Sequence, residues 1–371
     1  YVDTILTIGC AMIFMKVIEG SGALDALSSL IIEKFHRFPA VLLVLIMLII
    51  MFPGMITGSS TAAVLSAGSI MAPVLALMGI DAVTSGSIIA MGALLGMIAP
   101  PVNTAALIIC AGIDVPYVGF EGPLALITFP LAILFVLLLG YKQARHMDYE
   151  KLKPALEKQD AIRKQYGVRI YIPLLVLVAL MVIFKVLKLG EDIGMPLMFL
   201  ISAAVGLFTG KKINVLTAVP EAIRTAAPVM GILMGVGMFI EVMTATGVRG
   251  LVVISCLRLP STLWLLACAI SIPLFGAVSS YGACSVLGVP FAYIYASLLG
   301  GNSVVVLAAI SLIAAVGDMM PPTALAGLFA AQVTGVEKYT KILKRCIVPI
   351  IILLVYACFF LANSKLIAGL F

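Results

Sequence analysis

The stretch PGMITGSSTAAVLSAG at residues 53–68 returns as PLFGAVSSYGACSVLG at residues 273–288, 220 positions later. The two copies share a proline, two serines, an alanine and a glycine. These positions are Pro53, Ser59, Ser60, Ala63 and Gly68 in the first copy, and Pro273, Ser279, Ser280, Ala283 and Gly288 in the second. A second motif, Gly-x-x-x-Pro-Pro, follows each copy, at Gly96 to Pro101 and at Gly317 to Pro322. The chain is therefore an internal repeat of hydrophobic segments broken at matching points.

The composition places this repeat in a membrane. Hydrophobic residues make up 63% of the chain, charged residues only 11%, and the mean hydropathy is +1.23. Soluble domains are about 45–50% apolar and about 25% charged. Continuous apolar runs such as 123–140 approach the length of about 17–25 residues that a membrane helix needs, and they lack the alternation of a β-barrel. We therefore expect an all-α, multi-pass membrane protein embedded in the lipid bilayer. Paired breaks in its two halves indicate a midplane binding site of a secondary transporter.

Several other classes of function find no support in the sequence. The net charge of +6 is modest and lies in loops, so we do not expect a nucleic-acid partner. The seven cysteines form no Cys-x-x-Cys pair, so neither a disulfide framework nor a zinc site is indicated. No phosphate-binding loop, nucleophile elbow or metal-ligand cluster is present, so we do not expect an enzyme or an ATP-driven pump.

Charge divides the chain into two halves. The linker 141–170 holds eight basic and four acidic residues, which by the positive-inside rule places it in the cytoplasm. It separates a first repeat, 1–140, from a second, 171–371. Basic residues also follow the second broken helix, whereas the matching loop 112–122 is acidic. We therefore expect inverted topology, which requires an odd number of crossings between the hairpins. Either the stretch 248–259 crosses, or the helix ends beside it are shifted.

The helices are expected in the same order in both halves. In the first half they are 3–20, 23–35, 39–53, a hairpin 54–78, a broken helix 82–99 and 102–112, and a span 123–140. In the second half they are 221–246, 248–259, 260–273, a hairpin 275–299, a broken helix 303–320 and 323–334, and a span 346–363. Two further spans, 171–187 and 195–210, have no counterpart in the first half. Because the chain begins at Tyr1, we expect about two more helices to precede it in the intact protein.

The chemistry is expected at the four breaks. A glycine with three hydroxyl residues, Gly58 to Thr61, provides a tight turn and oxygen ligands. Pro100 and Pro101 cannot donate backbone hydrogen bonds, so the carbonyls of Gly96 and Met97 are expected to be free. Free carbonyls in hydrocarbon are costly unless a ligand such as sodium satisfies them. The helix N-termini at Asn103 and Thr323 would direct positive dipole ends at an anion.

These arguments give two sets of candidate residues. We expect the substrate to contact hydroxyl and amide side chains, namely Ser60, Thr61, Asn103, Thr104, Ser280 and Thr323. We expect sodium, as the coupling ion, to be bound by backbone and side-chain oxygens at both breaks. These residues are Ser59, Ser60, Gly96, Asn103, Ser279, Gly282, Gly317, Asp318 and Thr323. Tyr281 lies inside the second motif. A single such motif is usually a packing or kink feature, but its repetition at one offset favours function.

Charges within the spans have more than one interpretation. Asp318 has three interpretations, as a cation ligand, a proton carrier or a paired structural acid, and the cation role is favoured. Lys16 and Glu241 occupy equivalent points of the two halves, and the favoured interpretation is structural: they pair with each other or extend to the interface.

The segments GSSTAAVLSAGSIMAPVLALMGIDA and GMIAPPVNTAALIICAGIDVPYV resemble the large membrane subunit of the TRAP transporters, the tripartite ATP-independent periplasmic carriers. The segment VGDMMPPTALAGLFAAQVTGVEKYTKILKRCIVP is similar to the second-half counterpart, so the resemblance covers nearly the whole chain. It implies sodium-coupled import of organic anions, mostly carboxylates, across the bacterial or archaeal inner membrane. The implied partners are a periplasmic binding protein and a small four-helix membrane subunit. Val102 after the first Pro-Pro and Asp318 depart from the family pattern.

The resemblance implies an elevator mechanism. We expect the hairpins and broken helices to form a mobile domain, with the spans 123–140, 171–187 and 195–210 as scaffold. A dicarboxylate or citrate carrier that needs no binding protein and a sodium/proton antiporter of the same superfamily are the alternatives. A channel, or a structural membrane partner without transport of its own, is a different class. A channel predicts a continuous polar stripe, but the polar residues gather at the breaks.

Overall fold

The computed structural model describes residues 2–145, 161–187, 195–248, 251, 254–255, 258, 260–279 and 281–371. Within these ranges every regular element is a helix. Helices satisfy all backbone donors and acceptors internally, which apolar segments in a bilayer require. The expectation of an all-α, multi-pass membrane protein is thus confirmed.

The first two helices are separated by a sharp bend. Helix α1 (Val2–Ser21) and α2 (Ala23–Phe35) meet at Gly22, whose φ of +81° is readily adopted only by glycine. The axes of the segments Ile5–Ser21 and Ala23–Phe35 differ by 61°. The bend lets α1 run beside α11 and α12 while α2 turns to pack against α3.

The first hairpin turns at Gly58 and Ser59. Its arms are α3 (Pro39–Thr57) and a second arm made of α4 (Ser60–Ala63), the π-helical turn η1 (Val64–Gly68) and α5 (Ser69–Leu77). The prediction that the first arm ends at Pro53 is wrong, because α3 continues through this proline to Thr57. A proline inside a membrane helix is tolerated where its surroundings satisfy the freed backbone. Four residues later, the Thr57 hydroxyl donates to the Pro53 carbonyl at 2.7 Å, at the end of the helix.

The first broken helix follows the hairpin. It consists of α6 (Ala82–Gly96), an irregular segment 97–103 and α7 (Thr104–Gly112). The span α8 (Glu121–Ala144) completes the half and extends beyond the predicted 123–140 at both ends. The peptide bond between Pro100 and Pro101 is cis.

The second half has the same order of elements. A hairpin consists of α14 (Ser261–Ser279), α15 (Tyr281–Ala292) and the π-helical turn η4 (Tyr293–Leu298). The broken helix consists of α16 (Ser303–Ala315), the 3-10 turn η5 (Val316–Met319) and α17 (Leu325–Thr334). Helices α18 (Tyr339–Ala362) and α19 (Ser364–Ala368) end the chain. As in the first half, the predicted helix end at Pro273 is wrong, since Pro273 lies inside α14.

Three long helices join the halves. A short helix at 161–166 leads through η2 (Gly167–Tyr171) into α10 (Ile172–Leu187), which is followed by α11 (Met195–Thr209) and α12 (Val215–Ala245). The predicted spans 171–187 and 195–210 correspond to α10 and α11. Half of the predicted linker, 146–160, and much of the predicted crossing at 248–259 lie outside the described residues.

The halves interlock through the second parts of their broken helices. Helix α7 packs on α15 and α16 of the second half, and α17 packs on α6 and on the second arm of the first hairpin. One hydrophobic core therefore joins both hairpins, both broken helices, α8 and α18. The interlocking brings the two hairpin turns and the two breaks to the centre of the molecule.

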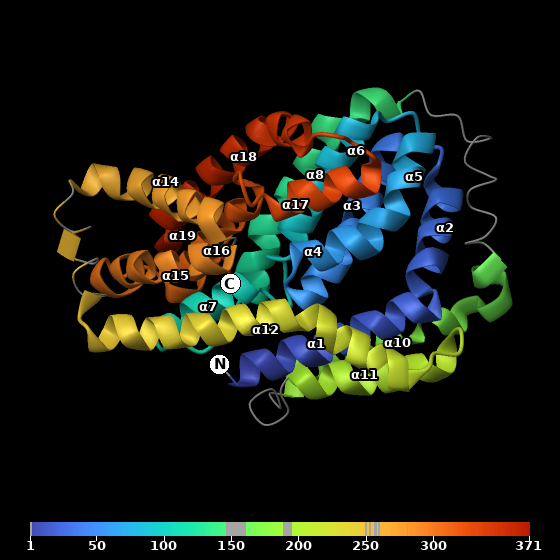
Figure 1. Ribbon diagram of the computed structural model, residues 1–371, viewed down its shortest axis with the longest axis horizontal. Helices are drawn as coiled ribbons and strands as arrows, with labels where there is room; N and C mark the ends of the chain where they lie inside the picture. The colour runs from blue at the N-terminus through green and yellow to red at the C-terminus, as the bar shows by residue number, and fades with distance from the viewer. Residues whose placement is uncertain are drawn as a thin grey trace.

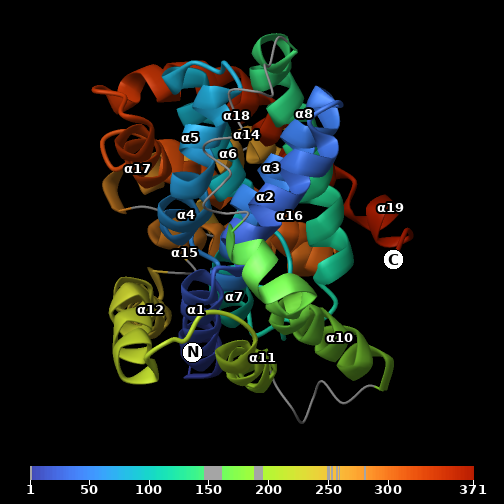
Figure 2. The ribbon, with the colours of Figure 1, turned by 90° about the vertical axis from the view of Figure 1, so that its right-hand side faces the viewer.

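Helices α1, α10, α11 and α12 form a separate layer along one side, which Figures 1 and 2 show from two directions. Its own cores contain Phe14 and Phe199, with ring centroids 6.0 Å apart. The span at 123–140, also predicted to belong to the scaffold, lies outside this layer. Helix α8 packs instead on α3 and α6, because its buried face carries large apolar residues such as Phe135 that fill the hairpin core.

Within the described ranges, five helices are long and apolar enough to cross a membrane, and a sixth span arises if the bent pair α1 and α2 counts as one. Several other apolar helices, including both parts of the second broken helix, are shorter. Short helices that end inside the protein leave backbone groups there without helical partners, which membrane proteins tolerate only where the segment is buried in protein or lines a water-filled cavity.

Candidate functional site

One pair of glycines holds each hairpin against the break of its own half. A Cβ built on Gly54 would lie 2.9 Å from the carbonyl carbon of Gly96, and one built on Gly96 would meet the backbone of Met51. In the second half, a Cβ on Gly276 would collide with the Cα of Gly317. Only glycine permits backbones this close. Each hairpin turn is thereby fixed beside a break.

The first hairpin turn is closed by local hydrogen bonds. Gly58 has a φ of +62°, and its carbonyl accepts a hydrogen bond of 2.6 Å from the Thr104 hydroxyl at the start of α7. The Ser59 hydroxyl caps α4 by accepting from the Ala62 amide at 3.3 Å. Thr61 follows in α4 with a partly buried side chain. The bond from Thr104 ties the turn to the first break, and the Ser59 cap fixes the start of α4.

Asn103 closes the first break. Its side-chain oxygen caps α7 by accepting from the Ala106 amide at 2.9 Å. Its side-chain amide donates to the Ile98 carbonyl at 3.0 Å and to the Ser311 hydroxyl at 2.9 Å. Ser311 lies on α16, so this buried side chain links the first break to the broken helix of the other half.

A carboxylate occupies the second break. Asp318 lies in η5 with its side chain fully buried. One of its oxygens accepts a hydrogen bond of 2.5 Å from the Ser60 hydroxyl of the first hairpin, and the other accepts a bond of 3.2 Å from the Tyr281 amide at the start of α15. The carboxylate therefore connects both hairpins. It has acceptor capacity left over, since an ionised carboxylate offers about four acceptor sites.

The second hairpin turn is described in part. Ser279 is the last residue of α14, and nothing is described of its side chain. Ser280 lies outside the described residues. Gly282 is buried in α15. The Thr323 hydroxyl donates to the Gly276 carbonyl at 2.9 Å, which ties this break to its hairpin as Thr104 does in the first half.

The hydroxyl of Tyr281 is buried at the centre of this arrangement. It has no hydrogen-bond partner among the described residues, although it lies beside the Thr104 side chain. A buried hydroxyl without a partner carries a desolvation cost that a ligand could relieve.

The break carbonyls are less exposed than the sequence predicts. The Gly96 carbonyl accepts from the Ala99 amide at 3.2 Å, and the Gly317 carbonyl accepts from the Met320 amide at 3.1 Å. The expectation that the Gly96 carbonyl is free is therefore wrong, because the chain tightens into a short turn before the prolines. The side chains, above all the Asp318 carboxylate, hold the free acceptor capacity at the breaks.

The structure thus gathers Ser60, Thr104, Tyr281 and Asp318 at the centre, with Asn103 joined to α16. Ser311, Gly54 and Gly276 were not identified from the sequence. Ser311 is the only hydroxyl within α16 after its first residue, which could have indicated it. The two glycines carried no usable signal, because they do not share the offset of the repeat.

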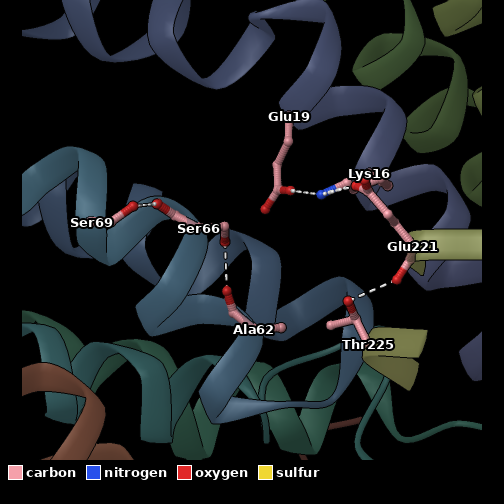
Figure 3. A network of polar contacts seen from close by, with 7 residues as sticks. All are labelled: Lys16, Glu19, Ala62, Ser66, Ser69, Glu221 and Thr225. Atoms are coloured by element: carbon pink, nitrogen blue, oxygen red, sulfur yellow. Dashed lines mark hydrogen bonds and ion pairs between the residues drawn. The ribbon is translucent and has the colours of Figure 1, made fainter. Parts of the chain in front are cut away.

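Lys16 lies in a separate polar network and does not pair with Glu241 as one interpretation proposed. Its ammonium is 3.0 Å from the carboxylate of Glu221 on α12 and 4.0 Å from that of Glu19. Figure 3 shows this network beside the first hairpin, where Ser66 donates to the Ala62 carbonyl at 2.6 Å. The difference arises because α12 packs along α1 and brings Glu221 beside Lys16.

Within the described part of the chain, no group of three His, Cys, Asp or Glu residues is placed to hold a metal ion. The central site instead offers one carboxylate among hydroxyl and backbone groups. Repeated hairpins and broken helices that meet at such a polar centre inside a multi-pass membrane protein define a secondary transporter.

Comparison with known families names the transporter type. The family model described as tripartite ATP-independent periplasmic transporter, DctM component, matches residues 2–364. The chain belongs to this family, which is a family of transporters and not of enzymes. The resemblance found in the sequence is thereby confirmed. No curated protein matches the chain.

Proposed function

We propose that this protein imports organic anions, most simply carboxylates, by coupling their entry to sodium. The observation that carries the proposal is the hydrogen bond from Ser60 to the buried Asp318, which joins the first hairpin to the second break. A ligand that binds at this carboxylate acts on both halves of the molecule at once.

The proposal that sodium is the coupling ion rests on the oxygen atoms that surround Asp318. Hard cations take oxygen ligands, and the centre offers the Asp318 carboxylate with hydroxyl and backbone oxygens around it. Among the described residues, no lysine or arginine forms an ion pair with Asp318. A fully buried carboxylate without a positive partner is costly. Sodium bound here as co-transported ion would offset that cost.

The proposal that the substrate is an anion rests on the N-terminus of α17. Its N-cap residue, Ala324, has a φ of +27° and provides no side-chain cap, so the first amides of α17 keep their capacity to donate. Helix α7, in contrast, is capped by Asn103. An uncapped helix N-terminus favours a negative charge. We therefore place the substrate carboxylate at α17, within reach of Thr323.

Coupling follows from the shared contacts. A cation at Asp318 would fix Ser60 and the Tyr281 amide, and with them both hairpin turns. Once sodium has ordered the turns, binding of the anion costs less conformational entropy. Each ligand therefore raises the affinity of the protein for the other. In an elevator movement, the hairpin core that includes α8 would slide against the layer of α1, α10, α11 and α12.

The family name supplies the partner classes. A tripartite system has three components, of which this chain is the large membrane one. We propose that a periplasmic binding protein delivers the substrate and that a small four-helix membrane subunit completes the scaffold in the inner membrane.

The test is uptake into proteoliposomes. The intact protein with its small subunit is reconstituted, and uptake of radiolabelled dicarboxylates and sugar acids is measured under an inward sodium gradient, with and without the binding protein. Sodium-driven uptake that requires the binding protein is expected. Uptake without it would indicate a stand-alone carboxylate carrier. Proton flux without organic substrate would indicate an antiporter, the candidate that the buried Asp318 also favours.

A further inference from the structure

A second site lies far from the hairpins, in the layer of α1, α11 and α12. A groove of about 220 Å³ opens there between α11 and α12, with α1 as its floor. All its lining residues are apolar: Ile13, Val17, Leu200, Ala203, Ala204, Leu207, Val215, Ala218 and Val219. A groove without polar lining residues suits an apolar chain and offers nothing to orient a polar ligand.

The groove ends at a basic turn. Leu207 and Val215 flank the turn between α11 and α12, which carries Lys211 and Lys212. Both lysine side chains are exposed, and neither forms an ion pair with a described residue. Two positive charges therefore stand at the mouth of an apolar groove.

The turn is held in place by α1. The Lys211 amide donates to the Ser21 carbonyl at 3.2 Å, and Gly210 packs directly against Ser21. Gly20 makes a similarly close approach to Ile213. The lysines are therefore presented from a fixed backbone, which lowers the ordering cost of binding.

The turn lies on the side of the membrane where anionic lipid attracts basic groups. A Cβ on Gly22 would contact both Ile162 and the Lys211 side chain, so the turn adjoins the end of the basic linker that the positive-inside rule places in the cytoplasm. Basic pockets between membrane helices on this side bind anionic lipid headgroups.

The nearby acids do not cancel these charges. Glu19 and Glu221 already share the ammonium of Lys16, which is 4.0 Å from the Glu19 carboxylate and 3.0 Å from that of Glu221. Figure 3 shows this network directed at the first hairpin.

We propose that this groove binds one acyl chain of an anionic phospholipid whose phosphate is held by Lys211 and Lys212. The lipid fills the space between α11 and α12 and stiffens the layer against which the hairpin core packs. The site is independent of the transport proposal, because none of its residues takes part in the central site.

The test is native mass spectrometry of the intact complex extracted into equimolar palmitoyl-oleoyl phosphatidylglycerol and phosphatidylcholine. The wild type is expected to retain phosphatidylglycerol preferentially, by roughly 5-fold for each lysine. Lys211→Ala with Lys212→Ala should abolish the preference. Lys341→Ala with Lys344→Ala, two exposed lysines on α18, is the matched control and should keep it.

A second variant tests the groove itself. Ala204 is an exposed lining residue, so Ala204→Trp should fill the groove without disturbing the core and should remove the lipid adduct of either headgroup. Leu266→Trp, on the exposed face of α14, is the control. Thermal unfolding verifies that each variant is folded. An equal preference in wild type and lysine variant, or an undiminished adduct in Ala204→Trp, overturns the proposal.

Discussion

The two breaks occupy equivalent positions but differ in chemistry. The first is closed by a neutral side chain, because Asn103 bonds its own break, caps α7 and reaches Ser311. The second holds the buried Asp318, and its α17 has no side-chain cap. Repetition of the backbone therefore does not repeat the site. In the first break the side chain of Asn103 has hydrogen-bond partners for both its oxygen and its amide. In the second break the Asp318 carboxylate and the first amides of α17 retain capacity to bind a ligand.

The largest expected effect comes from removing the charge. Asp318→Asn keeps the shape of the second break but makes it neutral like the first. If the charge binds sodium, sodium-driven uptake should fall by up to roughly 150-fold, the upper range of coupling between two sites. Uptake as a function of sodium concentration measures this. An unchanged sodium dependence would mean that the charge of Asp318 does not bind sodium and that the two breaks do not differ in this respect.

The next effect concerns the glycines that both breaks share. Gly96→Ala and Gly276→Ala each drive a methyl group into a neighbouring backbone, and overpacking of this kind costs about 1–3 kcal/mol. Gly235→Ala, in α12 with nothing within 4 Å of the new methyl, is the control and should not destabilise the protein. Thermal unfolding in detergent compares the three. If Gly96→Ala or Gly276→Ala unfolded at the same temperature as the wild type, close packing at the breaks would be dispensable.

Asn103 should matter more than an ordinary cap. Asn103→Ala leaves the Ile98 carbonyl and the Ala106 amide without their side-chain partner and removes the donor to Ser311, and it should lower the free energy of unfolding by about 1–3 kcal/mol. Asn302→Ala removes only the exposed cap of α16 and should cost about 1 kcal/mol. Chemical unfolding of both variants measures the difference. Equal costs would mean that the bond between the halves contributes nothing.

Loss of the Ser60 hydroxyl should weaken the link between hairpin and break. Ser60→Ala removes one donor from Asp318, and a hydrogen bond to a charged group is worth about 1.5 kcal/mol. The sodium concentration for half-maximal uptake should rise about tenfold, before folding is affected. Ser69→Ala, whose hydroxyl bonds only within its own hairpin arm, serves as control. Identical sodium curves for both variants would contradict the assignment.

The smallest effect concerns the caps of the intact helices that precede the breaks. Burial raises the pKa of Asp81, the cap of α6, but hydrogen bonds from Thr84 and Gln143 outweigh it and lower the pKa overall. Its contribution to stability is therefore present above the unfolded pKa of about 3.9 and is lost as pH falls through the lower folded value. Asp81→Asn should flatten thermal stability against pH in this acid range. Asn302, the neutral cap of α16, should contribute no such dependence.

Local features of the fold were predictable because they follow from local chemistry. Glycine, proline and serine at the turns and breaks located them, and α2 has the predicted bounds of 23–35. The helix ends predicted at Pro53 and Pro273 were wrong, because the end of a membrane helix depends on whether neighbouring groups satisfy its backbone. The propensity of proline alone does not decide it.

The contacts of the central site were not predictable from one chain. Ser60 and Asp318 are 258 positions apart, and no periodicity relates them. The same holds for Asn103 with Ser311, and for Lys16, whose partner is decided by the packing of α12 along α1. The grouping of α8 with the hairpins depends on tertiary packing that a hydropathy pattern does not contain.

The bond between Ser60 and Asp318 also has a consequence for how the protein is made. A ribosome adds roughly 5–20 residues per second, so the first hairpin waits for about 10–50 seconds before its partner is synthesised. During that time the face of α6 that α17 will cover lacks this partner. The hydroxyls of Ser66 and Ser69 donate to carbonyls of their own arm and are satisfied throughout, whereas Ser60 gains its acceptor last. The central site can therefore form only after Asp318 has been synthesised, and a chain truncated before α16 lacks it altogether.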